Sequence, residues 1–279
     1  MNPTANRRHF VLWMWVCLIL TENFQCGDAI HFGKIALEGQ FKYMAAIFNN
    51  GNHVCGGAVI DGRHILTAAH CVAHAKARAM AVITGAADWR SSRRQYSNVK
   101  NIHIHEEYMP LQNAKWKFVE YLQLEPRRWQ DLVTKHDIAV LTLTEALPLG
   151  ENIIAVMLPR KDSLPYCDTI SVAGWGRREN DETDSILRFS NLAVVSPQLS
   201  KRLDLASSKD QFDIMDFSRT SKMDVGDSGS PFVRNNIIYG VLSTGSEADL
   251  GNSVVVTQVY SYLDFIENAV HATYENDGK

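Results

Sequence analysis

The sequence predicts an all-β domain that ends in an α-helix. Short apolar or alternating segments recur along the chain and are separated by Gly, Asn, Asp or Pro, which is typical of a β-sandwich or barrel. Near the C-terminus, apolar residues instead follow helical spacing, at Val259, Leu263, Ile266 and Val270. With 279 residues, 46% of them hydrophobic, the chain can form one domain with a sizeable core.

Examples of the expected strands are the apolar segments 44–48, 53–60, 80–85, 138–143, 169–173, 187–195, 237–243 and 254–259. A short helix is expected around 199–205, after Ser196 and Pro197. Residues 108–133 form a long aromatic and basic stretch that breaks the strand pattern, and we interpret it as an insertion loop. Loops of this length usually have a function or are mobile.

The N-terminus has the three parts of a secretory signal peptide. Arg7 and Arg8 precede the apolar run 10–20, and polar residues follow from Thr21. We therefore assign 1–29 to a signal peptide, or to a signal peptide with a very short pro-segment. The alternative is a signal anchor, but the apolar run is too short to span a bilayer comfortably, so we expect no stable membrane anchor.

Secretion implies an oxidising environment, in which cysteines are candidates for disulfides. Cys55 and Cys71 flank a short segment and can pair with each other. Cys17 lies in the predicted signal peptide, and Cys26 and Cys167 have no obvious partners unless they pair together. The net charge of −3 provides no basic field for nucleic acid, which excludes that class of partner.

One glycine-flanked serine is a candidate nucleophile. Ser228 lies in the segment 226–231 (GDSGSP), which is expected to form a tight turn. A serine nucleophile needs a histidine base and a carboxylate that orients it. His70 follows an apolar run, and Asp137 begins another. Each residue alone also fits a plainer role: a surface loop for the serine, a structural histidine and a turn aspartate.

Four motifs together resemble those of the trypsin/chymotrypsin-like serine proteases, the peptidase S1 type. They are Thr67-Ala68-Ala69-His70-Cys71, Asp137-Ile138-Ala139-Val140-Leu141, Gly174-Trp175-Gly176 and Gly226-Asp227-Ser228-Gly229-Ser230-Pro231. Their order of histidine, aspartate and serine is that of the family. The resemblance implies two six-stranded antiparallel β-barrels with the active site between them, within a chymotrypsin-like protease domain at 30–279.

The resemblance also implies a role for each site residue. His70 would act as general base and then acid, Asp137 would orient it, and Ser228 would attack the substrate. The backbone N–H groups of Gly226 and Ser228 would form the oxyanion hole. We therefore expect a secreted, extracellular serine endopeptidase that forms an acyl-enzyme. The alternative is a catalytically weak or inactive homologue that acts as an extracellular binding or regulatory module.

A free N-terminus activates members of this family by pairing with the aspartate before the nucleophile. Here Ile30-His31-Phe32-Gly33 resembles that terminus, and Asp227 would be the partner of Ile30. Ala29 precedes Ile30, where a trypsin-type activation site has Arg or Lys. Our hypothesis is that signal cleavage, or removal of a very short pro-segment, creates the Ile30 terminus directly.

The specificity pocket departs from the family pattern. Ser243 and Gly245 resemble the substrate-binding strand, which pairs with the peptide backbone. Lys222 lies six residues before the nucleophile, where the family places the pocket base, and Val254 replaces a common glycine and would narrow the pocket. A lysine there disfavours Lys or Arg substrates by repulsion, so trypsin-like specificity is not expected. The alternative is that Lys222 points to solvent.

In this family the segment just before the aspartate borders the cleft, so the insertion before Asp137 would restrict or recruit substrates. The alternative is a peripheral elaboration. His103 and His105 alternate along an expected strand and so share a face. Two ligands do not complete a metal site, and we expect neither a metal nor a cofactor. The expected partners are protein or peptide substrates and protein inhibitors, and the expected state is a monomer.

Overall fold

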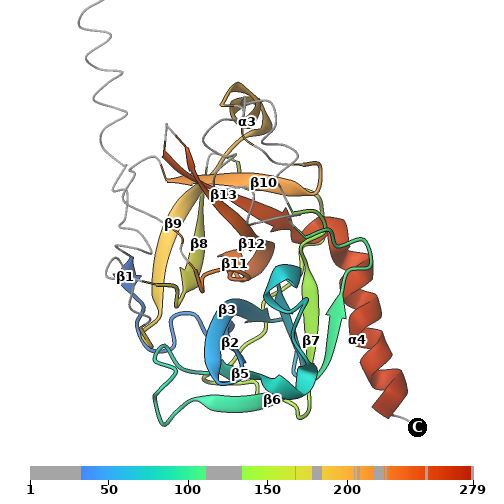
Figure 1. Ribbon diagram of the computed structural model, residues 1–279. Coiled ribbons are helices and arrows are strands. Elements are labelled where there is room, and N and C mark those ends of the chain that lie inside the picture. The colour runs from blue at the N-terminus through green and yellow to red at the C-terminus, as the bar shows by residue number, and fades with distance from the viewer. Residues whose placement is uncertain are drawn as a thin grey trace, which may run out of the picture.

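The structure is a computed structural model that describes residues 33–110, 134–166, 168–177, 184–203, 205, 208–216, 223, 225–248 and 251–277. Its strands form two closed barrels of six antiparallel strands, followed by a C-terminal helix (Figure 1). The predicted all-β fold, with two six-stranded barrels and a C-terminal α-helix, is therefore confirmed.

The first barrel closes in the order β2-β3-β4-β7-β6-β5. Its strands are β2 (Met44–Asn49), β3 (Asn52–Val59), β4 (His64–Thr67), β5 (Met80–Thr84), β6 (Gln95–Ile104) and β7 (Ala139–Leu143). Two short 3-10 helices, η1 (Ala69–Cys71) and η2 (Ala77–Ala79), connect β4 to β5. Fully buried aliphatic side chains fill the interior, among them Ile47, Ile65 and Leu141.

The second barrel closes because β8 pairs with both β9 and β11. Its strands are β8 (Thr169–Gly174), β9 (Arg188–Val194), β10 (Gln211–Asp216), β11 (Pro231–Arg234), β12 (Ile237–Ala248) and β13 (Gly251–Gln258). The short strand β1 (Lys34–Ile35) joins at β9. After β9 comes the helix α3 (Pro197–Arg202), whose first turn is capped by the Ser196 side chain, which accepts a hydrogen bond from the Leu199 N–H.

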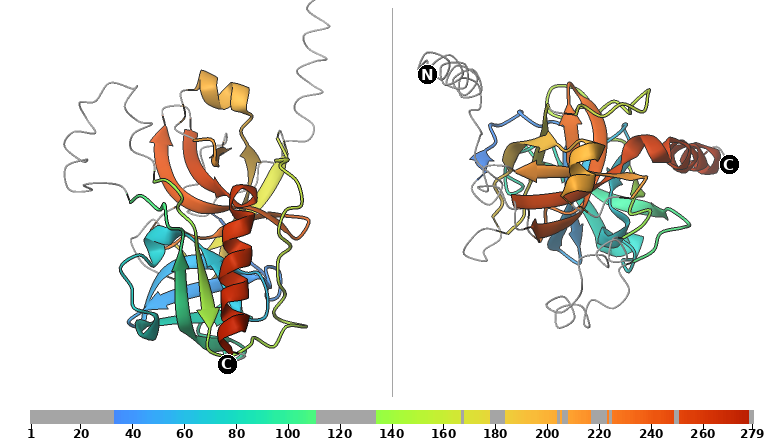
Figure 2. Two further views of the ribbon diagram at one scale, coloured as in Figure 1. Left: turned by 90° about the vertical axis from the view of Figure 1, so that its right-hand side faces the viewer. Right: turned by 90° about the horizontal axis from the view of Figure 1, so that it is seen from above.

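The C-terminal segment returns from the second barrel to the first. It consists of a 3-10 turn, η4 (Val259–Tyr262), and the helix α4 (Leu263–Asp277). Figure 2 shows α4 lying along the first barrel, beside β7. Thr273 holds it there through buried hydrogen bonds, at 3.0 Å to His64 Nε2 and 3.0 Å to Thr142 Oγ1. The helix therefore links the two barrels.

The structure contains strands at all the expected segments, and β6 is the strand on which His103 was expected to lie. It also contains β1, β4, β10 and β11. β10 has the sequence QFDIMD, and all six residues are buried. Because three of them are polar, the hydrophobic pattern did not predict this strand. The short helix lies at 197–202, slightly before the expected 199–205. The expected signal peptide and all but the first three residues of 108–133 lie outside the described residues. No helix within the described ranges is long and apolar enough to cross a membrane.

Candidate active site

The candidate triad is divided between the two barrels. His70 lies in η1, directly after β4, and Asp137 lies two residues before β7. Both therefore belong to the first barrel. Ser228 lies in the turn that leads into β11 of the second barrel. The site is thus assembled where the two barrels meet.

Asp137 holds His70 by two hydrogen bonds. Its carboxylate is fully buried and accepts one bond from the His70 backbone N–H, at 2.9 Å to Oδ1. The second joins His70 Nδ1 to Oδ2, at 2.8 Å. A carboxylate at Nδ1 favours the tautomer with the proton on that nitrogen. The Nε2 lone pair is then available to accept a proton.

Two hydroxyl groups complete the environment of the carboxylate. Ser243 Oγ donates to Asp137 Oδ2 at 2.6 Å, and Thr134 Oγ1 approaches the same oxygen at 3.4 Å. Burial alone would raise the pKa of Asp137, but the hydrogen bond and charge of His70, together with the Ser243 hydroxyl, outweigh it and hold the pKa below the ordinary value. The carboxylate is therefore ionised at neutral pH.

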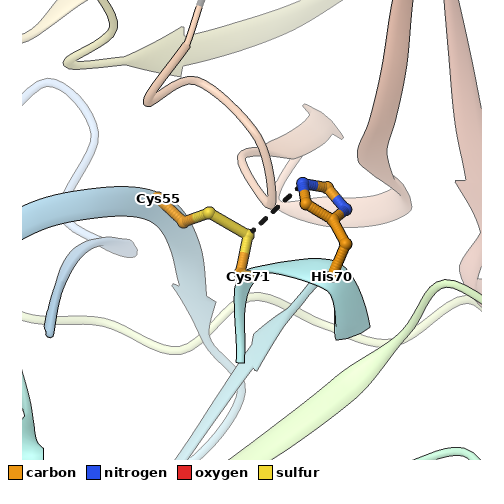
Figure 3. Close-up of side chains that lie close together, drawn as sticks. All are labelled: Cys55, His70 and Cys71. Carbon is orange, nitrogen blue, oxygen red and sulfur yellow. Dashed lines mark hydrogen bonds between the residues drawn. A yellow bond between two sulfur atoms is a disulfide. The ribbon is translucent and has the colours of Figure 1, made fainter. Parts of the chain in front are cut away.

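A disulfide fixes the chain that carries His70. Cys55 in β3 and Cys71 in η1 are bonded across a sequence separation of 16 residues. Figure 3 shows the His70 ring beside this bond, with Nε2 3.7 Å from Cys71 Sγ. Because Cys71 is the next residue after His70, the disulfide ties the histidine backbone to β3.

The turn around Ser228 requires glycine on both sides. Gly226 and Gly229 have φ angles of 99° and 77°, in the left-handed region that favours glycine. The turn is tied to both barrels, because Gly56 N donates to Ser228 O at 2.8 Å and Gly229 N donates to Leu242 O at 2.9 Å. The serine is therefore presented on a backbone with little freedom.

Ser228 and the N–H groups beside it form the second half of the candidate site. Across the described ranges, no hydrogen bond joins Ser228 Oγ to His70 Nε2, and the Ser228 side chain is partly exposed. Nor do the N–H groups of Gly226 and Ser228 donate a backbone hydrogen bond within this part of the chain. Two unused donors beside a partly exposed hydroxyl can receive a developing oxyanion.

Asp227, which lies in the same turn, is fully buried. Its Oδ1 accepts a hydrogen bond from Gly176 N at 2.8 Å. A Cβ on Gly174 or Gly176 would lie 2.2 or 2.3 Å from its carboxylate oxygens, so the Gly-Trp-Gly motif makes room for this aspartate. Ile30, its expected partner, lies outside the described residues.

A half-buried histidine that was not predicted lies beneath the turn. The ring of His53 stacks on Trp89, with centroids 4.6 Å apart, and a Cβ on Gly226 would lie 3.4 Å from it. Burial lowers the pKa of His53 to about 4. Its Nε2 has no hydrogen-bond partner among the described residues. The only sequence signal for this position beneath the turn is that His53 begins an apolar segment that is expected to be a strand.

The residues expected to bind substrate have different surroundings. Gly245 lies directly opposite Val254 in the β12–β13 ladder, and Val254 is buried in the apolar cluster of the second barrel. The Ser243 hydroxyl points at Asp137, and the pairing of its backbone with a peptide stays a prediction. Lys222 lies outside the described residues. Thr134 was not predicted at all; only its place three residues before Asp137 could have suggested it.

The two-barrel fold and the Asp137–His70 pair agree with the family to which the sequence belongs. A family model described as Trypsin matches residues 30–266, so the chain belongs to the trypsin family. It is 28% identical to trypsin 5G1 of Aedes aegypti over 77% of this chain and 75% of that protein. It is 25% identical to chymotrypsin-2 of Vespa crabro, over 84% and 97%. The solved structure of human heparin binding protein matches with a TM-score of 0.69 at 23% identity, over 86% of this chain and 96% of that one.

Proposed function

We propose that this trypsin-family protein is a secreted serine endopeptidase. The observation that carries the proposal is the pair of hydrogen bonds that His70 donates to Asp137. They leave Nε2 as a base on the side of the ring away from the carboxylate. Ser228 lies on a glycine-supported turn with unused backbone donors beside it. Together these groups supply a base, a nucleophile and an oxyanion site.

In the proposed reaction, Ser228 Oγ attacks the carbonyl carbon of a peptide bond while His70 Nε2 takes the hydroxyl proton. The N–H groups of Gly226 and Ser228 donate to the carbonyl oxygen as it becomes an oxyanion. His70 then gives its proton to the leaving amine, and the acyl-enzyme forms. Water repeats the sequence with His70 as base and releases the acid. The Ser228–His70 hydrogen bond is expected to tighten when substrate binds, as is common in such sites.

For specificity, we propose a preference other than Lys or Arg. The buried Val254 occupies space opposite Gly245, and Lys222 would repel a cationic side chain. A peptide library varied at the residue before the scissile bond tests this. Strong cleavage after Arg or Lys would refute it.

Activation is proposed to follow exposure of the Ile30 amine, which would pair with the buried Asp227. A buried carboxylate that loses its partner costs about 3–5 kcal/mol, enough to disorder the neighbouring turn before processing. N-terminal sequencing of active secreted protein tests the route. Any start other than Ile30 would contradict it.

The central experiment is labelling with a fluorophosphonate, which reacts only with an activated serine. We expect the processed protein to be labelled, and the Ser228→Ala variant and protein with a blocked Ile30 amine to remain unlabelled. Absence of label in correctly processed, folded protein would instead favour the alternative, a non-catalytic homologue that acts as a binding or regulatory module.

A further inference from the structure

A second cluster of potentially reactive side chains lies beside the candidate triad, because one of its members is the residue before Asp137. His105 and Glu107 follow β6, and His136 directly precedes Asp137. One potential ligand atom from each of the three residues lies within 4.8 Å of the other two. The two imidazole rings are nearly parallel, with centroids 5.0 Å apart and planes 12° apart, and His136 Nε2 is 3.9 Å from Glu107 Oε2.

The three residues converge because the backbone brings their segments together. Met109 and Lys135 form an isolated antiparallel bridge, with N–H···O distances of 3.0 and 3.3 Å in the two directions. His105 and Glu107 precede this bridge on one chain segment, and His136 follows it on the other, so all three lie on the same side of the bridge. The cluster therefore spans the two ends of the segment 111–133.

The protein also provides an outer partner for one ring. Tyr262 Oη lies 3.1 Å from His136 Nδ1. If Nδ1–H donates to this oxygen, Nε2 presents its lone pair toward Glu107, which is the usual arrangement of a metal-binding histidine. The His105 ring packs against the rings of Tyr262 and Phe265, at 5.2 and 5.1 Å.

We propose that His105, Glu107 and His136 bind one zinc ion. Two imidazoles and one carboxylate are ligands that zinc prefers, and they leave a fourth position for water. Zinc–ligand bonds of about 2.0–2.1 Å require ligand atoms roughly 3.3 Å apart in tetrahedral geometry. Zinc therefore requires the two nearly parallel rings to rotate toward one point, and His105 Nδ1 to give up the hydrogen bond that it accepts from the Glu107 N–H at 3.2 Å. Glu107, whose side chain is 69% exposed, has room for this movement. Calcium and magnesium, which prefer oxygen ligands, are not expected to bind.

This site differs from the pair of histidines, His103 and His105, that the sequence pattern placed on one face. His103 was paired with His105 on the basis of strand alternation, but its Nε2 lies 3.2 Å from Thr142 Oγ1 instead. His136 is the partner, and it has a left-handed backbone with φ of 51°. Zinc would thus join the two ends of the segment 111–133 and restrain the turn that leads into Asp137.

The test is calorimetric titration of untagged, secreted protein carrying Ser228→Ala with zinc chloride. The variant removes the proposed nucleophile, so the result does not depend on whether the protein is a protease. We expect one zinc ion per chain. His105→Gln, Glu107→Gln and His136→Asn should each weaken binding about tenfold or more. Asparagine is chosen at 136 because it tolerates the left-handed backbone. The matched controls, Glu106→Gln and the exposed His271→Gln, should bind zinc as the parent does.

Two further measurements separate loss of ligands from loss of fold. The melting temperature without metal should be the same in all variants, and zinc should raise it only where the three ligands remain. Cobalt(II) should give the visible absorption bands of a tetrahedral ion in the parent and lose them in His136→Asn. Absence of zinc binding, or zinc binding unchanged in all three ligand variants, would overturn the proposal.

Discussion

The hydroxyl of Thr134 lies 2.7 Å from the hydroxyl of Ser243, and the pair joins the segment before β7 to the strand β12 of the other barrel. The Thr134 carbonyl also accepts a hydrogen bond from Gln211 Nε2, at 2.9 Å. Since Ser243 in turn donates to Asp137, the orientation of the buried carboxylate depends on contacts from both barrels.

Thr134→Val removes this hydroxyl without changing the shape of the side chain. We expect kcat/KM on a peptide substrate to fall about threefold to tenfold, near 1 kcal/mol, with little change in KM. Thr134→Ser keeps the hydroxyl and should retain most of the activity. Equal activity in the valine and serine variants would show that the contact does not position Asp137.

Gly229 and Gly51 form a matched pair for testing the serine turn. Both have a left-handed φ, 77° and 78°, but a Cβ at Gly51 meets nothing within 4 Å, whereas one at Gly229 would lie 2.3 Å from Thr67 Oγ1. We expect Gly51→Ala to cost about 1 kcal/mol of unfolding free energy. Gly229→Ala should cost roughly 1–3 kcal/mol more, because of overpacking. Denaturant unfolding measures both, and similar losses would contradict the predicted clash.

Because of His53, we expect the free energy of unfolding to decrease in acid. The pKa of His53 is lowered to about 4 in the folded state, so the unfolded chain binds the proton more tightly. The free energy of unfolding should therefore fall as the pH drops from about 6.5 to about 4, by up to about 3 kcal/mol from this group. His53→Phe keeps an aromatic ring against Trp89 and should remove that part of the decline, as measured by unfolding at pH 7 and pH 4. His74→Gln, at an exposed position, is the control. An identical decline in His53→Phe and the parent would contradict the assignment.

We expect the double variant Cys55→Ala and Cys71→Ala, which lacks the disulfide, to have a lower free energy of unfolding. Closing a loop with a separation of 16 residues is expected to contribute about 3 kcal/mol in the chain-entropy model. The loss should appear in denaturant unfolding of the oxidised proteins. It should disappear when the parent is first reduced, and a loss below about 1 kcal/mol under oxidising conditions would contradict it.

The motifs could be read from the sequence because each is local. Apolar alternation predicted the main strands, and the residue types around His70, Asp137 and Ser228 indicated the chemistry. Their shared order indicated the family and, through it, the two barrels. None of these signals needed contacts between distant parts of the chain.

The supporting contacts could not be read in this way because they depend on the packing of distant segments. Thr134 reaches Ser243 across 109 residues of sequence, and nothing local marks either hydroxyl as a partner of Asp137. His105 was expected to share a face with His103, but it lies past the end of β6, so strand alternation no longer applies to it. Its neighbour is His136, which is reached only when the Met109–Lys135 bridge forms.

The division of the site between the barrels has a consequence for refolding. A chain with both barrels formed but not yet docked would lack the Gly56–Ser228 and Thr134–Ser243 hydrogen bonds that cross between them. Such an intermediate would have native β-sheet signals and no reactive serine. The interval between the return of circular dichroism and the return of fluorophosphonate reactivity would thus measure how quickly the two halves come together.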